Sequence, residues 1–223
     1  MLLQISAAAD TVANESQEAI TVFELALEGG YMMIPIFLLL IAAIYIFIER
    51  MLTIRNASKV PANFNSTVKK MVADGDISGA KVFCSQNDSP IARMIEKGIS
   101  RIGSPLKNIE VSIENVGKIE VYKLEKNLST LATISGAAPM IGFLGTVTGM
   151  IQAFISIAQE EGAVSPKLLS GGIYEAMITT ASGLIVGIIA YLGYNYLVAK
   201  VQNLIHKMEY SSIEFIELLQ EPR

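Results

Sequence analysis

Glu175 is the residue whose type and setting point most clearly to chemistry. It is the single charged residue within three long apolar windows, 29–48, 127–159 and 168–199. A carboxylate in such a segment is costly in lipid, so it normally faces a bundle interior or a water-filled cavity, where it can bind and release a proton. We therefore take Glu175 as the leading functional residue.

A polar stripe continues from Glu175 along its own segment. In a regular helix Thr179 and Ser182, at i+4 and i+7, share the face of Glu175, whereas Thr180 lies roughly 140° around the axis. Spacing alone therefore favours Thr179 as the hydroxyl that accompanies the carboxylate. The alternative is that Glu175, eight residues past Lys167, is simply solvated at the outer interface. The inward course of the stripe favours the functional interpretation.

The second apolar window carries a hydroxyl on a face of small residues. On a 3.6-residue period that face holds Pro139, Gly142, Thr146, Gly149 and Ala153. Two small-xxx-small pairs, Gly145 with Gly149 and Gly183 with Gly187, indicate close helix packing and nothing more specific. Thr146 is thus a candidate lining residue, although a threonine in such a helix often only bonds its own i−4 carbonyl.

The elements that must position these residues are membrane helices. The 223-residue chain is 52% hydrophobic and 17% charged, against about 25% charged in soluble domains. Each window exceeds the roughly 20 apolar residues that span a bilayer, which excludes a soluble globular or disordered protein. The second and third windows are longer than needed, so we expect both helices to continue into the cytoplasm. Their small residues predict packing against protein, and the larger residues of the first predict more lipid contact.

The basic residues predict the orientation. Residues 1–30 contain no Lys or Arg, whereas 49–126 hold most of those in the chain. Because basic loops stay inside, we expect the N-terminus outside and the C-terminus in the cytoplasm. The predicted division is a periplasmic amphipathic segment 1–28, transmembrane helix 29–48, cytoplasmic helical domain 49–126, transmembrane helix 127–158, periplasmic loop 159–170, transmembrane helix 171–199 and cytoplasmic helix 200–223.

The cytoplasmic segment reads as short helices followed by a charged one over about 109–131. No breaker separates that charged helix from the second apolar window, which predicts one continuous rod with Glu120, Lys123 and Glu125 on its wet end. Cys84 has no second cysteine to pair with and is best explained as a small buried hydrophobe.

Two motifs resemble a known family. The stretch SGAAPMIGFLGTVTGMIQAF, followed by GGIYEAMITTASGLIVGIIAYLGYN, closely resembles the ExbB/TolQ/MotA proton-channel family, and ExbB most of all. The resemblance covers about residues 25–205. It implies an all-α membrane protein with three transmembrane helices, assembled as a homo-oligomeric ring, pentameric in ExbB-like proteins, around an ExbD-like single-span partner with an essential Asp.

The resemblance also implies roles. The proton-motive force would drive H⁺ through the assembly in the bacterial inner membrane, and a TonB-like protein would pass the work to outer-membrane transporters. By position, the family's lining threonines fall on Thr146 and Thr180 and its glutamate on Glu175. Spacing had favoured Thr179, which we keep as second choice.

Several alternatives stay open at this stage. A TolQ-like, gliding or secretion motor would use the same residues, whereas a passive scaffold would need only the glycines. An enzyme is disfavoured because the lone His206 lies past the third window and no HExxH occurs. We expect no cofactor and no metal, with H⁺ as the coupling ion, and partners limited to other protein chains and membrane lipid, without nucleic acid.

Overall fold

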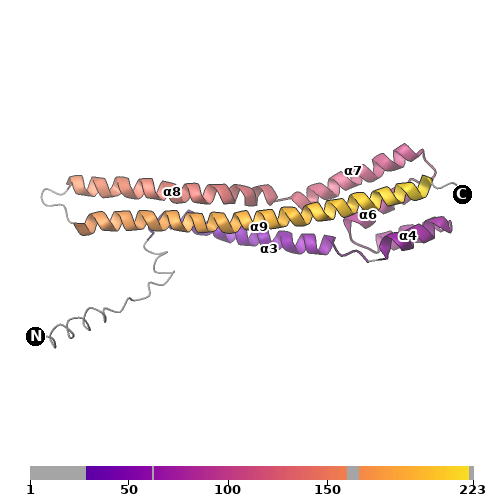
Figure 1. Cartoon of the computed structure of the whole chain (residues 1–223), viewed down its shortest axis with the longest axis horizontal. Helices are drawn as coiled ribbons and strands as arrows, with labels where there is room; N and C mark the ends of the chain where they lie inside the picture. The colour runs from indigo at the N-terminus through magenta and orange to yellow at the C-terminus, as the bar shows by residue number, and fades with distance from the viewer. Residues whose placement is uncertain (1–28, 62, 160–165, 221–223) are drawn as a thin grey trace, which may run out of the picture. The chain divides into compact units, whose positions relative to one another are not determined.

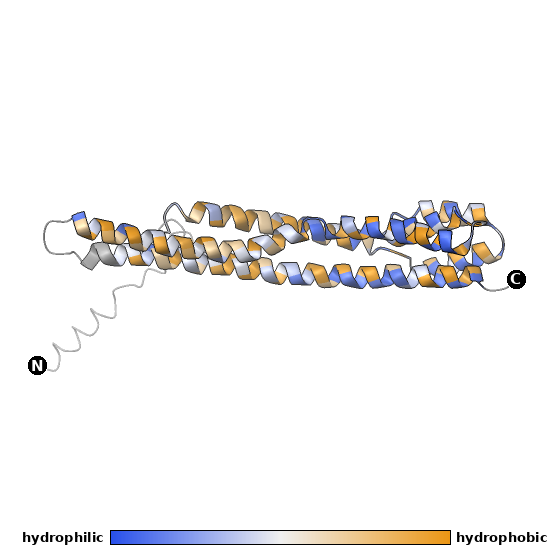
Figure 2. Ribbon diagram, turned by 90° about the horizontal axis from the view of Figure 1, so that it is seen from above, coloured by the Kyte–Doolittle hydropathy of each residue, from blue (hydrophilic) through white to orange (hydrophobic). Residues whose placement is uncertain are grey.

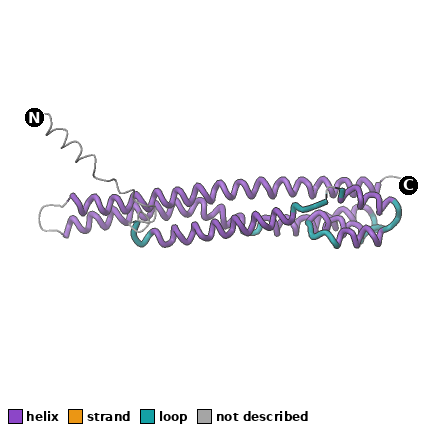
Figure 3. The backbone as a smooth tube through the Cα atoms, turned by 90° about the horizontal axis from the view of Figure 1, so that it is seen from below, coloured by secondary structure: helices purple, strands orange, loops and turns teal. Residues whose placement is uncertain are grey.

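The computed structural model describes residues 29–61, 63–159 and 166–220, and the expected amphipathic segment 1–28 lies outside them. Within these ranges every regular element is a helix (Figure 3). The helices, labelled in Figure 1 where there is room, are α3 Met33–Ala57, α4 Phe64–Ala73, α5 Ile77–Ser85, α6 Pro90–Ile99, α7 Leu106–Glu125, α8 Leu128–Gln159 and α9 Pro166–Gln220. The predicted all-α class is confirmed.

Three helical stretches in the described residues are long and apolar enough to cross a membrane, as the sequence predicted. They are Met33–Ala57, which is α3, Leu106–Gln159, which includes α7 and α8, and Ser170–Gln220, which is most of α9. Figure 2 shows the contrast in hydropathy: orange residues dominate long runs of these helices, and blue residues gather on the short helices. The protein is therefore a multi-pass membrane protein by the length and composition of its helices.

The chain divides into two compact units. One consists of the chain up to Leu38 together with Ala138–Val186, and the other of Leu39–Ala137 with Gly187–Arg223. The first unit thus contains the described start of α3, most of α8 and the first part of α9. It also contains all the residues that the sequence singled out for chemistry.

In the second unit the short helices α4 to α7 pack in sequence order and share one apolar core. Local signals start two of them: the Asp76 side chain accepts a hydrogen bond from Gly79 N at 2.8 Å, and Ser89 caps α6 by accepting one from Ala92 N at 3.2 Å. The largest fully buried side chains of this core are Phe64, Ile99, Ile113, Leu131, Leu197 and Leu204.

The predicted continuous rod is wrong at residues 126–127. Helix α7 ends at Glu125, Lys126 is extended, and Asn127 has a left-handed φ of 63° before α8 begins. Arg50, which is buried, donates a hydrogen bond to the Lys123 carbonyl at 3.0 Å. That carbonyl lies in the last turn of α7, where the helix leaves it without a partner of its own.

Glu120 is also not at a wet end. Its side chain is 4% exposed and pairs with Arg93 of α6 at 2.6 Å and with Lys123 at 2.7 Å. Burial disfavours the carboxylate, but the hydrogen bonds from Arg93 and Lys123 outweigh this, and the pKa of Glu120 lies below its usual range. Cys84 is buried as predicted, and burial raises the pKa of its thiol to about 12.

Candidate functional site

Three oxygen atoms meet where α8 and α9 are in contact in the first unit. The Thr180 hydroxyl donates to the Gly142 carbonyl at 3.0 Å, and the Thr146 hydroxyl, one turn further along α8, reaches the same carbonyl at 3.4 Å. The two hydroxyls are also hydrogen-bonded to each other across the helix pair. Thr146 in addition approaches the Ala176 carbonyl at 3.4 Å. The result is a polar cluster shared by two apolar helices.

Glycines allow the two helices to come close enough for this cluster. A β-carbon on Gly142 would lie 2.8 Å from the Thr179 carbonyl oxygen, and one on Gly183 would lie 2.6 Å from the Ala138 carbonyl oxygen. Both clashes are with backbone atoms, which cannot rotate away. The small residues of the sequence pattern therefore act here by letting one backbone touch another.

Thr179 and Thr180 have different surroundings. Thr179 is 2% exposed and donates to the Ala176 carbonyl of its own helix at 2.8 Å, with a longer contact of 3.4 Å to the Gly142 carbonyl. A β-carbon on Gly145 would overlap its hydroxyl. Thr179 is thus enclosed between the helices, whereas Thr180 is half-buried and joins Thr146. Thr180, which the family resemblance selected, is therefore the hydroxyl bonded to Thr146. Which of Thr179 and Thr180 takes part in proton transfer stays a prediction.

Glu175 does not join the threonine cluster within the single chain. It is half-buried, and its carboxylate lies beside Gly30, where the chain enters α3. Since α9 is regular here, Glu175 and Thr180 project roughly 140° apart around the axis, as the wheel indicated. The carboxylate and the hydroxyls therefore lie on different sides of α9.

The remaining residues that the sequence predicted for helix packing are Gly149, Pro139 and Gly187. Gly149 faces Ala176, whose Cβ would be 3.1 Å from an added β-carbon, so it belongs to the same contact. Pro139 is half-buried inside α8, and Gly187 is buried in the second unit.

Three participants were missed at the sequence level: the carbonyls of Gly142 and Ala176, and Gly30. Backbone carbonyls give no residue-type signal, although a stripe of glycines indicates that backbone will be accessible to a neighbouring helix. Gly30 has only the Gly29-Gly30 doublet to mark it.

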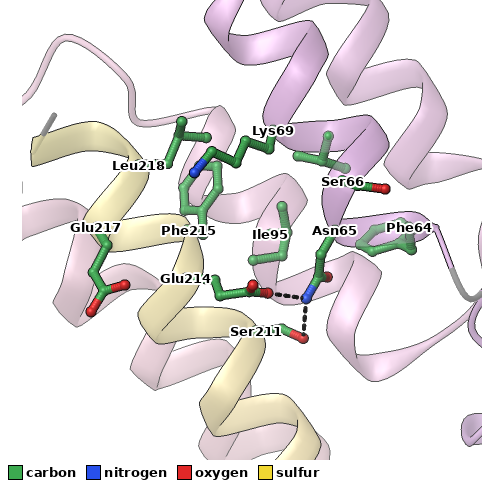
Figure 4. Close-up of a pocket in the computed structure, with 11 residues that line it drawn as sticks. Phe64, Asn65, Ser66, Lys69, Ile95, Ser211, Glu214, Phe215, Glu217 and Leu218 are labelled. Atoms are coloured by element: carbon green, nitrogen blue, oxygen red, sulfur yellow. Dashed lines mark hydrogen bonds between the residues drawn. The ribbon is translucent and has the colours of Figure 1, made fainter.

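The second unit contains hollows between its described helices. Figure 4 shows one, a cavity of about 230 Å³ between α4 and α9, in which the Asn65 amide donates to Ser211 Oγ at 3.1 Å and to Glu214 Oε2 at 2.6 Å. These hydrogen bonds link α4 to α9, and they give the side chains of Asn65, Ser211 and Glu214 partners within the protein. Among the described residues no group of three or more His, Cys, Asp or Glu side chains could hold a metal ion.

The comparison with known proteins covers both helices of the threonine cluster. Residues 86–210 match the family model of the MotA/TolQ/ExbB proton channel family, a region that includes Thr146, Glu175 and Thr180. The chain belongs to this family.

Individual relatives of this MotA/TolQ/ExbB chain carry mainly ExbB names. It is 29% identical over 196 residues to a putative biopolymer transport protein ExbB homolog of Methanothermobacter thermautotrophicus, covering 85% of this chain and 67% of that protein. It is 35% identical over 134 residues to the biopolymer transport protein ExbB of Aquifex aeolicus, covering 60% of this chain and 84% of that protein. A shorter match, 38% over 82 residues, is to the Tol-Pal system protein TolQ of Haemophilus influenzae, covering 37% and 36%.

Proposed function

We propose that this chain is the ExbB-like subunit of a proton-driven motor in the bacterial inner membrane, which energises TonB-dependent transport across the outer membrane. The observation that carries the proposal is the hydroxyl pair of Thr146 and Thr180, bonded across two membrane helices to the Gly142 carbonyl, in a member of a proton-channel family. Hydroxyls both donate and accept, so a pair in contact can pass a proton between water and a carboxylate.

The proposed pathway needs an acid from a second chain. The apolar windows contain one carboxylate, Glu175, and no Lys, Arg or His. One carboxylate does not complete a relay, so we assign the other to an Asp of an ExbD-like single-span partner. Moving one proton through about 150 mV releases about 3.5 kcal/mol, so several protons per cycle can drive substantial work on a TonB-like protein.

Assembly and orientation form part of the proposal. Within one chain the Thr146–Thr180 pair and Glu175 lie on different sides of α9. In a homopentameric ring both would face the common lumen. The excess of Lys and Arg in 49–126 supports a cytoplasmic location for that segment, with the N-terminus periplasmic and the C-terminus cytoplasmic.

The test is the loss of one hydroxyl without loss of shape. Thr146→Val in the complete complex should abolish partner-dependent energised uptake and leave ring assembly intact. The matched control is Thr148→Val on the same helix, because the Thr148 hydroxyl bonds only its own turn, to the Leu144 and Gly145 carbonyls at 3.0 and 3.1 Å. Thr148→Val should transport normally. Normal uptake by both single variants, Thr146→Val and Glu175→Ala, would refute the motor and favour a passive scaffold.

The match to TolQ raises a second candidate function within the same mechanism. A TolQ-like subunit would use the same hydroxyls but energise a different partner. Expression of the chain with its genomic partner in cells lacking ExbB, and separately in cells lacking TolQ, distinguishes the two. We expect rescue of TonB-dependent uptake in the first strain. Rescue of envelope integrity in the second strain alone would assign the chain to the Tol system.

A further inference from the structure

Gly30 and Glu175 are in unusually close contact. A β-carbon built on Gly30 would overlap Glu175 Oε1 and lie 2.8 Å from its Cδ and 3.5 Å from its Cγ. The carboxylate therefore occupies the space that any other residue type would need at position 30. Both residues belong to the first compact unit, so the contact lies within one body of the structure.

The backbone at Gly30 is fixed in place. Its φ is +63°, a conformation that glycine adopts without strain, and its carbonyl accepts the Met33 amide at 3.1 Å in the turn that starts α3. Next to it, a β-carbon on Gly29 would lie 3.2 Å from Cγ2 of Ile178, one turn along α9 from Glu175. The turn thus lies against α9 at two positions, Glu175 and Ile178.

Two other glycines show that a positive φ does not by itself require such a contact. Gly75 and Gly103 have φ values of +83° and +95°, and a β-carbon on either would meet nothing within 4 Å. At these positions glycine serves the backbone alone. Gly30 meets a second demand, which comes from the side chain of Glu175.

We propose that Gly30 is a positioning residue for Glu175: its bare Cα is the surface on which the carboxylate rests, so the entrance of α3 sets where that carboxylate points. A methyl group at position 30 would drive the carboxylate out of this place. The effect on transport rests on the proposed function, whereas the contact itself does not.

The first experiment measures the contact without any transport assay. Thermal unfolding of the detergent-solubilised full chain is followed for Gly30→Ala, Glu175→Ala and the double variant, with Gly103→Ala as the control for strain at positive φ. Gly30→Ala should lower Tm by slightly more than Gly103→Ala, because the displaced carboxylate is the end of a flexible side chain and can rotate away at a modest cost. In the Glu175→Ala background the loss from Gly30→Ala should shrink to that of the control, because the clashing carboxylate is gone.

Equal losses from Gly30→Ala in both backgrounds would overturn the proposal. Should Gly30→Ala fail to fold, the double variant decides: recovery of folded protein supports the contact, and its absence refutes it.

The second experiment measures positioning in the complete complex with its partner. Gly30→Ala should lower proton-driven uptake at least tenfold, and Gly103→Ala should leave it unchanged. Unaltered uptake by Gly30→Ala would refute the positioning role. If even the wild-type complex moves no protons, the proposed function fails, while the Tm coupling still reports on the contact.

Discussion

Glu120 is buried, although its charged neighbours in the sequence suggest an exposed helix face. It lies in a helix rich in Glu and Lys, yet its side chain is 4% exposed and is bonded by Arg93 and Lys123. Its pKa is lowered because those two cations outweigh the cost of burial. A carboxylate with a lowered folded-state pKa stabilises the fold above its unfolded value of about 4.5, and this contribution is lost as the pH falls through the folded value.

Replacing Glu120 by Gln should therefore destabilise the protein in a pH-dependent way. At pH 7 we expect a loss of about 1–3 kcal/mol, because Arg93 loses its buried counter-charge. The difference from wild type should narrow as the pH falls from about 4.5 through the lowered folded-state pKa of Glu120, because the wild-type carboxylate then also becomes neutral. Chemical unfolding in detergent at a series of pH values checks this.

The control for Glu120 is Glu114→Gln on the same helix. Glu114 forms an ion pair with Lys118 at 2.7 Å, but both side chains are more than half exposed. Exposed pairs contribute little, so this change should cost less than about 1 kcal/mol at any pH. Equal effects of the two substitutions would contradict the buried ion pair.

Cys84 should be chemically inert in the folded protein. Burial raises the pKa of its thiol to about 12, so almost no thiolate is present at pH 8, and the sulfur is shielded as well. A maleimide should label Cys84 at a negligible rate in the native state and rapidly in denaturant. Because Cys84 is the sole cysteine of the chain, the labelling reports on this residue alone, and fast native labelling would show that α5 is not packed as described.

At the scale of the helices, the contact between α8 and α9 depends on Gly183. A β-carbon there would meet the Ala138 carbonyl oxygen at 2.6 Å and the Gly142 Cα at 2.9 Å. Gly183→Ala should cost about 1–3 kcal/mol by forcing the helices apart, and should separate Thr146 from Thr180. Gly136→Ala is the matched control in α8, since its β-carbon would meet nothing within 4 Å. That change should be neutral or stabilising by up to about 1 kcal/mol in thermal unfolding.

The junction between α7 and α8 makes its own prediction. Asn127 has a φ of 63°, which asparagine tolerates and a β-branched residue does not. Asn127→Val should lower the free energy of unfolding by about 1–3 kcal/mol. Asn127→Gly keeps the backbone unstrained and loses only the side-chain hydrogen bond to Glu49, so it should cost about 1 kcal/mol or less. If valine instead stabilises the chain, the two helices join into the continuous rod that the sequence suggested.

The whole molecule allows a test of topology. Lys and Arg are concentrated in 49–126 and absent from 1–30, so we expect residues 49–126 to lie in the cytoplasm. Alkaline phosphatase, which is active only in the periplasm, should be inactive when fused after Gly75 and active when inserted within 159–170. The opposite pattern would invert the proposed orientation.

Composition and small-residue motifs predicted much of this molecule because they depend on local sequence. The long apolar windows predicted three membrane-spanning helices, because such segments are unfavourable in water. The paired motifs around Thr146 and Glu175 predicted the family. The break at Lys126–Asn127 was missed because Asn is a weak local signal and the bond from Arg50 comes from a distant element. Glu120 was misplaced for a similar reason: its burial depends on Arg93 of α6.

Three hydroxyls lie within hydrogen-bond distance of the Gly142 carbonyl: Thr180 donates to it at 3.0 Å, and those of Thr146 and Thr179 are each 3.4 Å away. With respect to stability these bonds act in parallel, since removing any one leaves the oxygen with other donors. Proton transfer, by contrast, needs every hydroxyl along its pathway, so it fails when one of them is removed. Single Thr→Val changes at this carbonyl should consequently separate folding from conduction more cleanly than substitutions elsewhere in the helix pair, so defects in uptake can be assigned to the relay and not to a damaged fold.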